Sequence, residues 1–90
     1  MARQPHTPEL RRAILEVVEN QLRDGTPPET QATLDRLLAA GHSRAEAIEL
    51  IACVVSAEIF DVLKRGQPYQ EQRYLAGLRA LPRLPWDDAE

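Results

Sequence analysis

Residues 43–65, S-R-A-E-A-I-E-L-I-A-C-V-V-S-A-E-I-F-D-V-L-K-R, form the longest segment of periodic apolar residues in this 90-residue chain. At 100° per residue, one set of its apolar side chains falls within an arc of about 120° on a helical wheel. The set comprises Ile48, Ile51, Ala52, Val55, Ile59, Val62 and Leu63. A stripe of this width is typical of a helix that packs on a core. The pattern therefore predicts a long central helix in an all-α domain.

Both ends of this segment carry signals that begin or end a helix. Ser43 stands three residues before Glu46, the spacing of a capping box, in which each side chain bonds the other residue's backbone amide. Lys64 and Arg65 suit the negative end of the helix dipole, and Gly66 can adopt the left-handed conformation that ends a helix. The central helix is predicted to lie between these signals.

A second group of apolar residues in the segment lies outside the main stripe: Leu50, Cys53, Val54 and Phe60. The middle of the helix is therefore apolar nearly all round, and neighbouring elements must cover it on more than one side. This pattern is typical of a helix at the centre of a bundle.

Three further helices are predicted around the central one. Residues 7–9, T-P-E, give a helix start with threonine as N-cap and proline at N1, and the amphipathic pattern runs to about residue 23. Residues 26–29, T-P-P-E, give a second capping box and a helix to about residue 40. A last helix covers about residues 70–80, where Gly77 costs about 1 kcal/mol relative to alanine.

The chain is predicted to be one compact four-helix domain over residues 7–82, because its length supports a single small core. A flexible leader at residues 1–6 precedes the domain. A flexible acidic tail at residues 83–90 follows it, since the prolines at 82 and 85 oppose a helix. We expect this tail to be extended and disordered.

The net charge of −3 originates at the C-terminus, where Asp87, Asp88 and Glu90 lie. Removing these three from fourteen acidic residues leaves eleven, equal to the eleven Lys and Arg. A neutral body lacks the positive charge that phosphate contacts require, so we expect no nucleic-acid partner. No apolar run approaches the ~18 to 20 residues that span a bilayer, and no charged leader precedes an apolar stretch. We therefore expect a soluble cytoplasmic protein with no membrane partner.

Residues 37–48, L-L-A-A-G-H-S-R-A-E-A-I, resemble a DNA-binding helix-turn-helix with Gly41 in the turn. A recognition helix offers Arg, Lys, Asn or Gln to base edges, whereas this one offers Glu46 and Glu49 and then becomes apolar. Residues 41–48 also resemble the loop and helix of ubiquitin-associated three-helix domains, which are shorter than this chain. We favour neither alternative.

Candidate catalytic and metal-binding residues are few. Carboxylate-bridged metal sites in helical bundles use Glu-x-x-His pairs, and the sequence has none. His42 and Glu46 are four residues apart, but a turn and a capping box are predicted there, so we interpret His42, and likewise His6, as solvated. Cys53 lies in the most apolar part of the central helix and is predicted to pack as a small hydrophobe. We expect that the protein is not an enzyme and that it binds neither a cofactor nor a metal.

Glu58 is the polar residue best placed for a defined role. It lies at the edge of the main stripe between apolar neighbours, so its carboxylate is predicted to be partly buried. A buried carboxylate needs a partner, which an arginine or a tyrosine hydroxyl from the first or last helix would supply. A structural ion pair is the favoured interpretation, and a binding role stays open. Asp61 is predicted to point toward solvent.

Five motifs extend across the predicted domain: D-G-T-P-P-E-T (24–30), L-x-R-L-x-A-x-G-H-S (34–43), E-A-I (46–48), E-I (58–59), and P-Y (68–69) with Y-L-x-x-L (74–78). Together they resemble a family of small uncharacterised all-helical bacterial proteins, classed as a domain of unknown function. The resemblance covers about residues 7–82. It implies the Pro-Pro helix start, the Gly-x-Ser turn and the long central helix, and it implies no catalytic residue.

By elimination, we expect a non-catalytic helical protein-interaction module that forms a homodimer or binds an unidentified protein partner. Leu50 and Val54, on the second apolar face, and Glu58 are candidate partner-binding residues, together with Trp86 in the tail. Trp86 is predicted either to fold back on its own bundle or to dock on another chain. The alternative function is a small-molecule or metal-binding accessory protein that uses a cleft near Glu58. A polar-lined pocket would favour that alternative, and an apolar patch would favour a protein partner.

Overall fold

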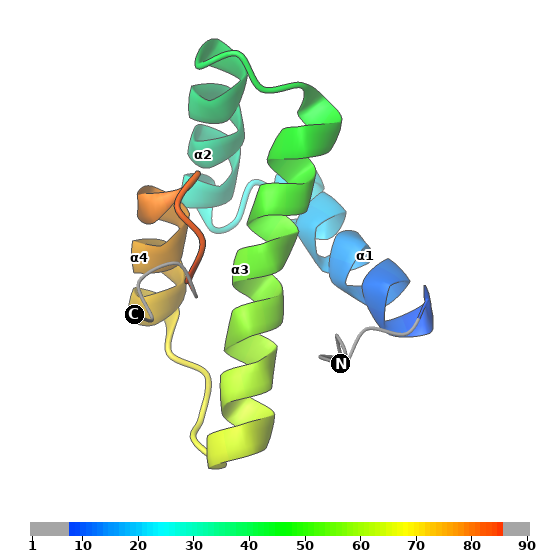
Figure 1. The fold of residues 1–90 in the computed structure, drawn as a ribbon, viewed down its shortest axis with the longest axis vertical. Coiled ribbons are helices and arrows are strands. Elements are labelled where there is room, and N and C mark those ends of the chain that lie inside the picture. The colour runs from blue at the N-terminus through cyan, green and yellow to red at the C-terminus, as the bar shows by residue number, and fades with distance from the viewer. Residues whose placement is uncertain (1–7, 86–90) are drawn as a thin grey trace.

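The chain folds into helices joined by short loops, and the computed structural model describes residues 8–85 (Figure 1). The helices are α1 (Pro8–Asp24), α2 (Pro28–Ala39), α3 (Arg44–Arg65) and α4 (Glu71–Ala80). No strand occurs within residues 8–85. The predicted all-α class and the long central third helix are confirmed.

The helix α3 is the element on which the other helices pack. It contacts α1, α2 and α4, and in Figure 1 α1 passes behind it while α2 and α4 lie to its left. Its buried side chains include Ile51, at 0% exposure on the main stripe, and Val54, at 1% exposure outside that stripe. From the other elements, the core receives Ile14, Val18, Leu34, Leu37, Tyr74, Leu78 and Leu81. The prediction that neighbours cover the central helix on more than one side is confirmed.

The predicted ends of α3 are also confirmed. The Ser43 amide donates to Glu46 Oε1 at 3.0 Å, and the Glu46 amide donates to Ser43 Oγ at 3.0 Å, which completes the capping box. At the other end, Gly66 takes φ +67° and its amide donates to the Val62 carbonyl. A residue with a Cβ would be strained in that left-handed conformation, so glycine ends the helix here.

The predicted capping box at the start of α2 is wrong. Pro27 is the N-cap residue, with φ −72° and ψ 151°, and no side chain accepts a hydrogen bond from the first turn. A residue that precedes a proline is driven out of the helical conformation, so Pro28 keeps Pro27 extended and delays the helix by one residue. Glu29 consequently lies one position too early to bond the threonine amide, although its charge still suits the N-terminal dipole.

The last two turns of α3 reach beyond the helices that pack on it, as the lower end of α3 in Figure 1 shows. Leu63, which the main stripe assigned to the core, is 76% exposed, and Phe60 is 48% exposed. The prediction for Leu63 is therefore wrong. The periodicity of a helix identifies an apolar face but does not reveal where its neighbours end.

Gly77 allows α4 to approach α3 closely. A Cβ built on Gly77 would stand 2.7 Å from Val54 Cγ1, well inside the ~3.5 to 4.0 Å of a normal carbon contact. The predicted weak point of the last helix is thus also the position at which α4 covers α3.

The segment after α4 folds back on the core as far as the structure describes it. Leu81 is 2% exposed, and Leu84 packs against the core. Arg36 of α2 holds the end of α4, since its guanidinium donates to the carbonyls of Leu78 (2.9 Å) and Leu81 (2.8 Å). Residues 86–90, which include Trp86, lie outside the described residues, as does the predicted leader at residues 1–6.

Candidate functional site

An apolar groove lies between α1, the C-terminal half of α3 and the segment that leads into α4. The two long helices cross and then diverge toward the start of α1 and the end of α3 (Figure 1). The groove has a volume of about 330 Å³. It is lined by Val17, Gln21, Val55, Glu58, Ile59, Val62, Leu63, Tyr69 and Tyr74. All of these except Gln21 and Glu58 are apolar or aromatic.

Large apolar side chains from three different segments surround the mouth of the groove. Val17 of α1 is 38% exposed, Leu63 of α3 is 76% exposed, and Tyr69 of the connecting segment is 55% exposed. The Tyr69 ring lies against that of Tyr74, with centroids 6.4 Å apart and planes tilted by 52°. The lining of the groove therefore combines a pair of aromatic rings with aliphatic side chains.

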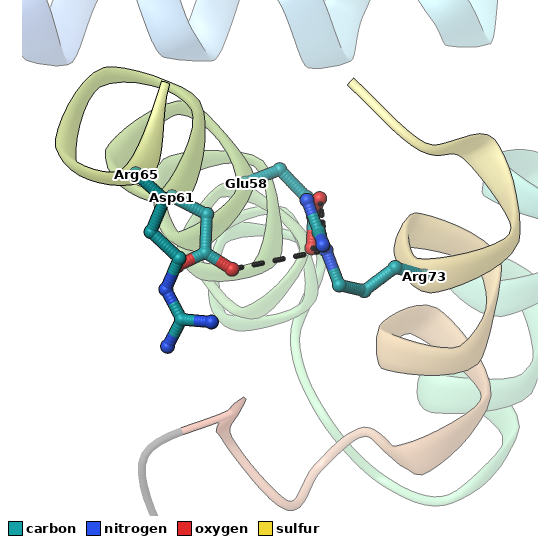
Figure 2. Close-up of polar contacts among 4 residues, drawn as sticks. All are labelled: Glu58, Asp61, Arg65 and Arg73. Atoms are coloured by element: carbon teal, nitrogen blue, oxygen red, sulfur yellow. Dashed lines mark hydrogen bonds and ion pairs between the residues drawn. The ribbon is translucent and has the colours of Figure 1, made fainter. Parts of the chain in front are cut away.

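Glu58 lies in the wall of the groove and is held by Arg73 of α4 (Figure 2). Arg73 Nε donates to Oε1 of Glu58 at 2.9 Å and to Oε2 at 3.1 Å. The Glu58 side chain is only 10% exposed, and that of Arg73 is 31% exposed. The predicted burial of Glu58 and its pairing with an arginine of the last helix are confirmed.

Asp61 joins the same charged cluster, contrary to the prediction that it points toward solvent. Its Oδ2 lies 3.7 Å from Arg73 Nε, and its Oδ1 lies 3.5 Å from Arg65 Nε. Figure 2 shows Glu58 and Asp61 of α3 turned toward Arg73 of α4. One nitrogen of Arg73, Nη2, is buried and has no hydrogen-bond partner among the described residues. Arg73 is thus shared between two carboxylates of adjacent turns.

The predicted partner-binding face at Leu50 and Val54 is not an open surface. Val54 is 1% exposed because Gly77 lets α4 lie directly over it. Leu50 is half-buried and packs against the core. The assignment of Val54 to a free face is therefore wrong, and Trp86 lies outside the described residues.

A buried hydrogen-bond network under the groove was missed by the sequence analysis. Gln21 Oε1 accepts a hydrogen bond from Thr30 Oγ1 at 2.7 Å and another from the Tyr74 hydroxyl at 2.8 Å. Thr30 is 0% exposed, and burial is the main cause that raises the pKa of Tyr74. The network joins α1, α2 and α4. The available signal was Gln21 itself, a polar residue four positions after Val17 on an otherwise apolar face.

Cys53 and His42 take positions close to those predicted. Cys53 is half-buried rather than fully packed, and burial, followed by the charge of Glu49, raises the pKa of its thiol. His42 lies in the turn before α3, and its Nδ1 is 3.7 Å from Glu46 Oε1. Glu46 is already bound to the Ser43 amide, so this contact is secondary to the helix cap.

Neither metal ligands nor a membrane span can be assigned in the part of the chain that the structure describes. Within residues 8–85, no three His, Cys, Asp or Glu side chains come close enough to hold a metal ion. Of the described helices, none combines the length and the apolar character needed to cross a bilayer.

Comparison with known proteins assigns no family to the chain. No family model matches the sequence, and no curated protein or solved structure is significantly similar to it. The resemblance to small helical bacterial proteins therefore depends on the sequence motifs alone and stays a prediction.

Proposed function

We propose that this chain is a non-catalytic protein-interaction module whose groove receives apolar side chains of a partner protein. The proposal depends on one observation, the gathering of Val17, Leu63 and Tyr69 around a single concavity while each stays exposed. Single exposed apolar residues are common on protein surfaces, but a contiguous patch of them marks a site of interaction.

The polar groups of the groove support a binding role rather than a catalytic one. The Gln21 oxygen already accepts two hydrogen bonds, and both oxygens of Glu58 accept from Arg73. A general base or a metal ligand must be able to reach a substrate or an ion, and Glu58 would first have to leave Arg73. The carboxylate instead fixes the wall against which a partner would pack.

An apolar small molecule is the second candidate occupant, because the groove volume of about 330 Å³ is at the low end of the range for ligand sites. Such sites bury most of a ligand's surface. Here Leu63, at the mouth, is 76% exposed, so this side chain offers a small ligand little cover from water. A protein partner would bring its own surface to cover Leu63 and Tyr69, which is why we favour it.

The test uses a matched pair of surface variants. Val17→Asp places a charge in the groove, whereas Leu38→Asp places one on α2 at nearly the same starting exposure, 38% against 39%. We expect proteins captured by the wild type to be retained by Leu38→Asp and lost by Val17→Asp. Urea unfolding of both variants checks that each remains folded.

A photo-crosslinking residue at position 63 provides the direct measurement, because Leu63 lines the groove and is highly exposed. A crosslinked partner that disappears with Val17→Asp supports the proposal. Capture that is equally strong with Val17→Asp would overturn it. Native mass spectrometry of the purified protein separates the second candidate, which predicts a co-purifying small molecule that Val17→Asp removes.

A further inference from the structure

The outer face of α3, opposite the core, is a surface distinct from the groove. It consists of Glu49, Cys53, Ser56, Ala57, Phe60 and Lys64, which fall within an arc of about 100° at 100° per residue. Phe60 is 48% exposed and the Glu49 side chain is 44% exposed. Cys53, Ser56 and Ala57 are half-buried and small, so the helix backbone lies close to the surface between the two larger ends.

The residues of this outer face are arranged in complementary pairs about its midpoint. The midpoint of the face lies between Ser56 and Ala57. Cys53 and Phe60 lie equally far from this midpoint on opposite sides, and so do Glu49 and Lys64. The outer pair joins an acid with a base, the next pair joins a small residue with a large one, and the central pair consists of two small residues. Such a face is complementary to a second copy of itself turned through a two-fold axis.

The charges determine the direction of the pairing. In an antiparallel arrangement, Glu49 of each copy, whose carboxylate Arg11 of α1 also binds within its own chain, meets Lys64 of the other, and Phe60 packs over the small side chain of Cys53. In a parallel arrangement, Glu49 would meet Glu49 and Phe60 would meet Phe60, which brings like charges and the two bulky side chains together. Lys64 already leans over Phe60, with its Nζ 5.6 Å from the ring centroid, so its ammonium lies beside the face.

We propose that two copies of this chain associate through antiparallel packing of their α3 outer faces, centred between Ser56 and Ala57. The small residues at the centre let the helix axes approach to about 8 Å. The interface is one helix face in each chain, so we expect a dissociation constant in the micromolar range. This inference does not depend on the groove, which stays open to a partner on a different side of α3.

A disulfide across the two-fold axis tests the arrangement. In a Cys53→Ser background, Ala57→Cys places two thiols near the axis, within reach of each other under mild oxidation. The control is Ala76→Cys in the same background, an exposed alanine on α4. We expect a covalent dimer from the first variant and none above background from the control. Equal crosslinking of the two variants would overturn the proposal.

Analytical ultracentrifugation adds a test of direction that does not require a disulfide. An Arg11→Ala background frees Glu49 from its ion pair within the same chain. In that background, Glu49→Lys and Lys64→Glu should each raise the dimer dissociation constant about tenfold, because each creates two like-charged contacts. The double variant should return to within about threefold of the Arg11→Ala parent, since it exchanges the charges of both contacts. The groove variant Val17→Asp should leave the dissociation constant of the dimer unchanged. A wild-type chain that is monomeric at about 1 mM, or a double variant as weak as the single ones, would overturn the inference.

Discussion

Arg73 is shared by two carboxylates of α3, and this sharing limits what Glu58 can do. Its Nε reaches both oxygens of Glu58, with Asp61 a further contact at 3.7 Å. The buried Nη2 has no partner among the described residues, so part of the desolvation cost of the guanidinium is not recovered. The pair links α4 to α3, and the cost of desolvating its two charges offsets much of their attraction.

We predict that Glu58→Ala lowers the free energy of unfolding by about 1 to 3 kcal/mol, because it leaves Arg73 partly buried without its main partner. Urea denaturation followed by circular dichroism measures the loss. The control is Glu49→Ala, which removes an exposed carboxylate paired with Arg11 and should cost at most about 1 kcal/mol. Equal losses in the two variants would show that burial of Glu58 has no energetic consequence.

Single residues were predictable where helical spacing alone fixes the environment. Glu58 is flanked by apolar residues one turn away in both directions, so its burial followed from the pattern. Its partner was predictable only as a type, since either tyrosine or arginine could have served. Gln21 was equally well marked by its apolar neighbours, but its two partners come from α2 and α4, and local spacing carries no information about residues that distant.

At the scale of elements, the contact of α4 with α3 depends on the missing side chain of Gly77. We predict that Gly77→Ala lowers stability by about 1 to 2 kcal/mol, although alanine favours a helix by about 1 kcal/mol. The added methyl would meet Val54 Cγ1, which belongs to a β-branched side chain with little freedom to move. Thermal unfolding measures the net effect.

A double-mutant cycle with Val54→Ala isolates the cause of that loss. With the valine methyls removed, Gly77→Ala should cost less than in the wild type, and helix propensity could then make it favourable. A cost of the same size in both backgrounds would contradict the close approach of the two helices.

The end of α4 is held by a residue of α2 rather than by its own sequence. We predict that Arg36→Ala lowers stability by about 1 to 2 kcal/mol, since the carbonyls of Leu78 and Leu81 lose charged donors. Amide hydrogen exchange should accelerate most in the last turn of α4. Arg79→Ala, an exposed arginine in that same turn, is the control and should change exchange much less. Similar exchange rates in both variants would indicate that Arg36 acts only through its charge near the negative end of the helix dipole, and not through its hydrogen bonds.

Helix ends were predictable when the signal was local and unopposed. The capping box of α3 and the glycine that ends it were read correctly, because both act within a few residues. The box predicted for α2 failed because two rules compete there, and the restriction that Pro28 imposes on Pro27 prevails over a side-chain cap. The assignment of Val54 to an open face failed because Gly77 acts on a residue of another helix.

For the molecule as a whole, the sequence predicted a bundle but not the angles at which its helices cross. The groove lies where α1 and α3 diverge, and Leu63 in its lining is exposed although it continues the apolar stripe of α3. The angle at which two helices cross depends on how the side chains of both interdigitate. It therefore cannot be derived from the sequence pattern of one helix alone. The candidate site was therefore predictable at Glu58 and unpredictable at Val17 and Tyr69.

Stability of the whole fold should depend on alkaline pH through two groups, the half-buried thiol of Cys53 and the buried hydroxyl of Tyr74. Burial is the first cause that raises the pKa of the Cys53 thiol and that of the Tyr74 hydroxyl above their ordinary values. The folded chain therefore keeps these protons to a higher pH than the unfolded chain does. Wherever the unfolded state binds fewer protons, stability falls as pH rises. Below about pH 8, these two groups should not change the urea midpoint of unfolding. The midpoint should decline as the pH rises past the ordinary pKa of a thiol, and more steeply above about pH 10, where tyrosine ionises in the unfolded chain.

Two variants assign this decline to its sources. Cys53→Ala should remove the early part of the pH dependence, and Tyr74→Phe should reduce the part above about pH 10, to which Tyr69, whose pKa burial also raises, contributes the rest. Tyr74→Phe also loses the hydrogen bond to Gln21, so its stability starts lower at neutral pH, and the slope rather than the absolute value is the decisive quantity. Absorbance of tyrosinate provides a second measurement, in which Tyr74 should lose its proton together with unfolding. Identical slopes in the wild type and both variants would mean that the surroundings of Cys53 and Tyr74 do not raise the pKa of either group.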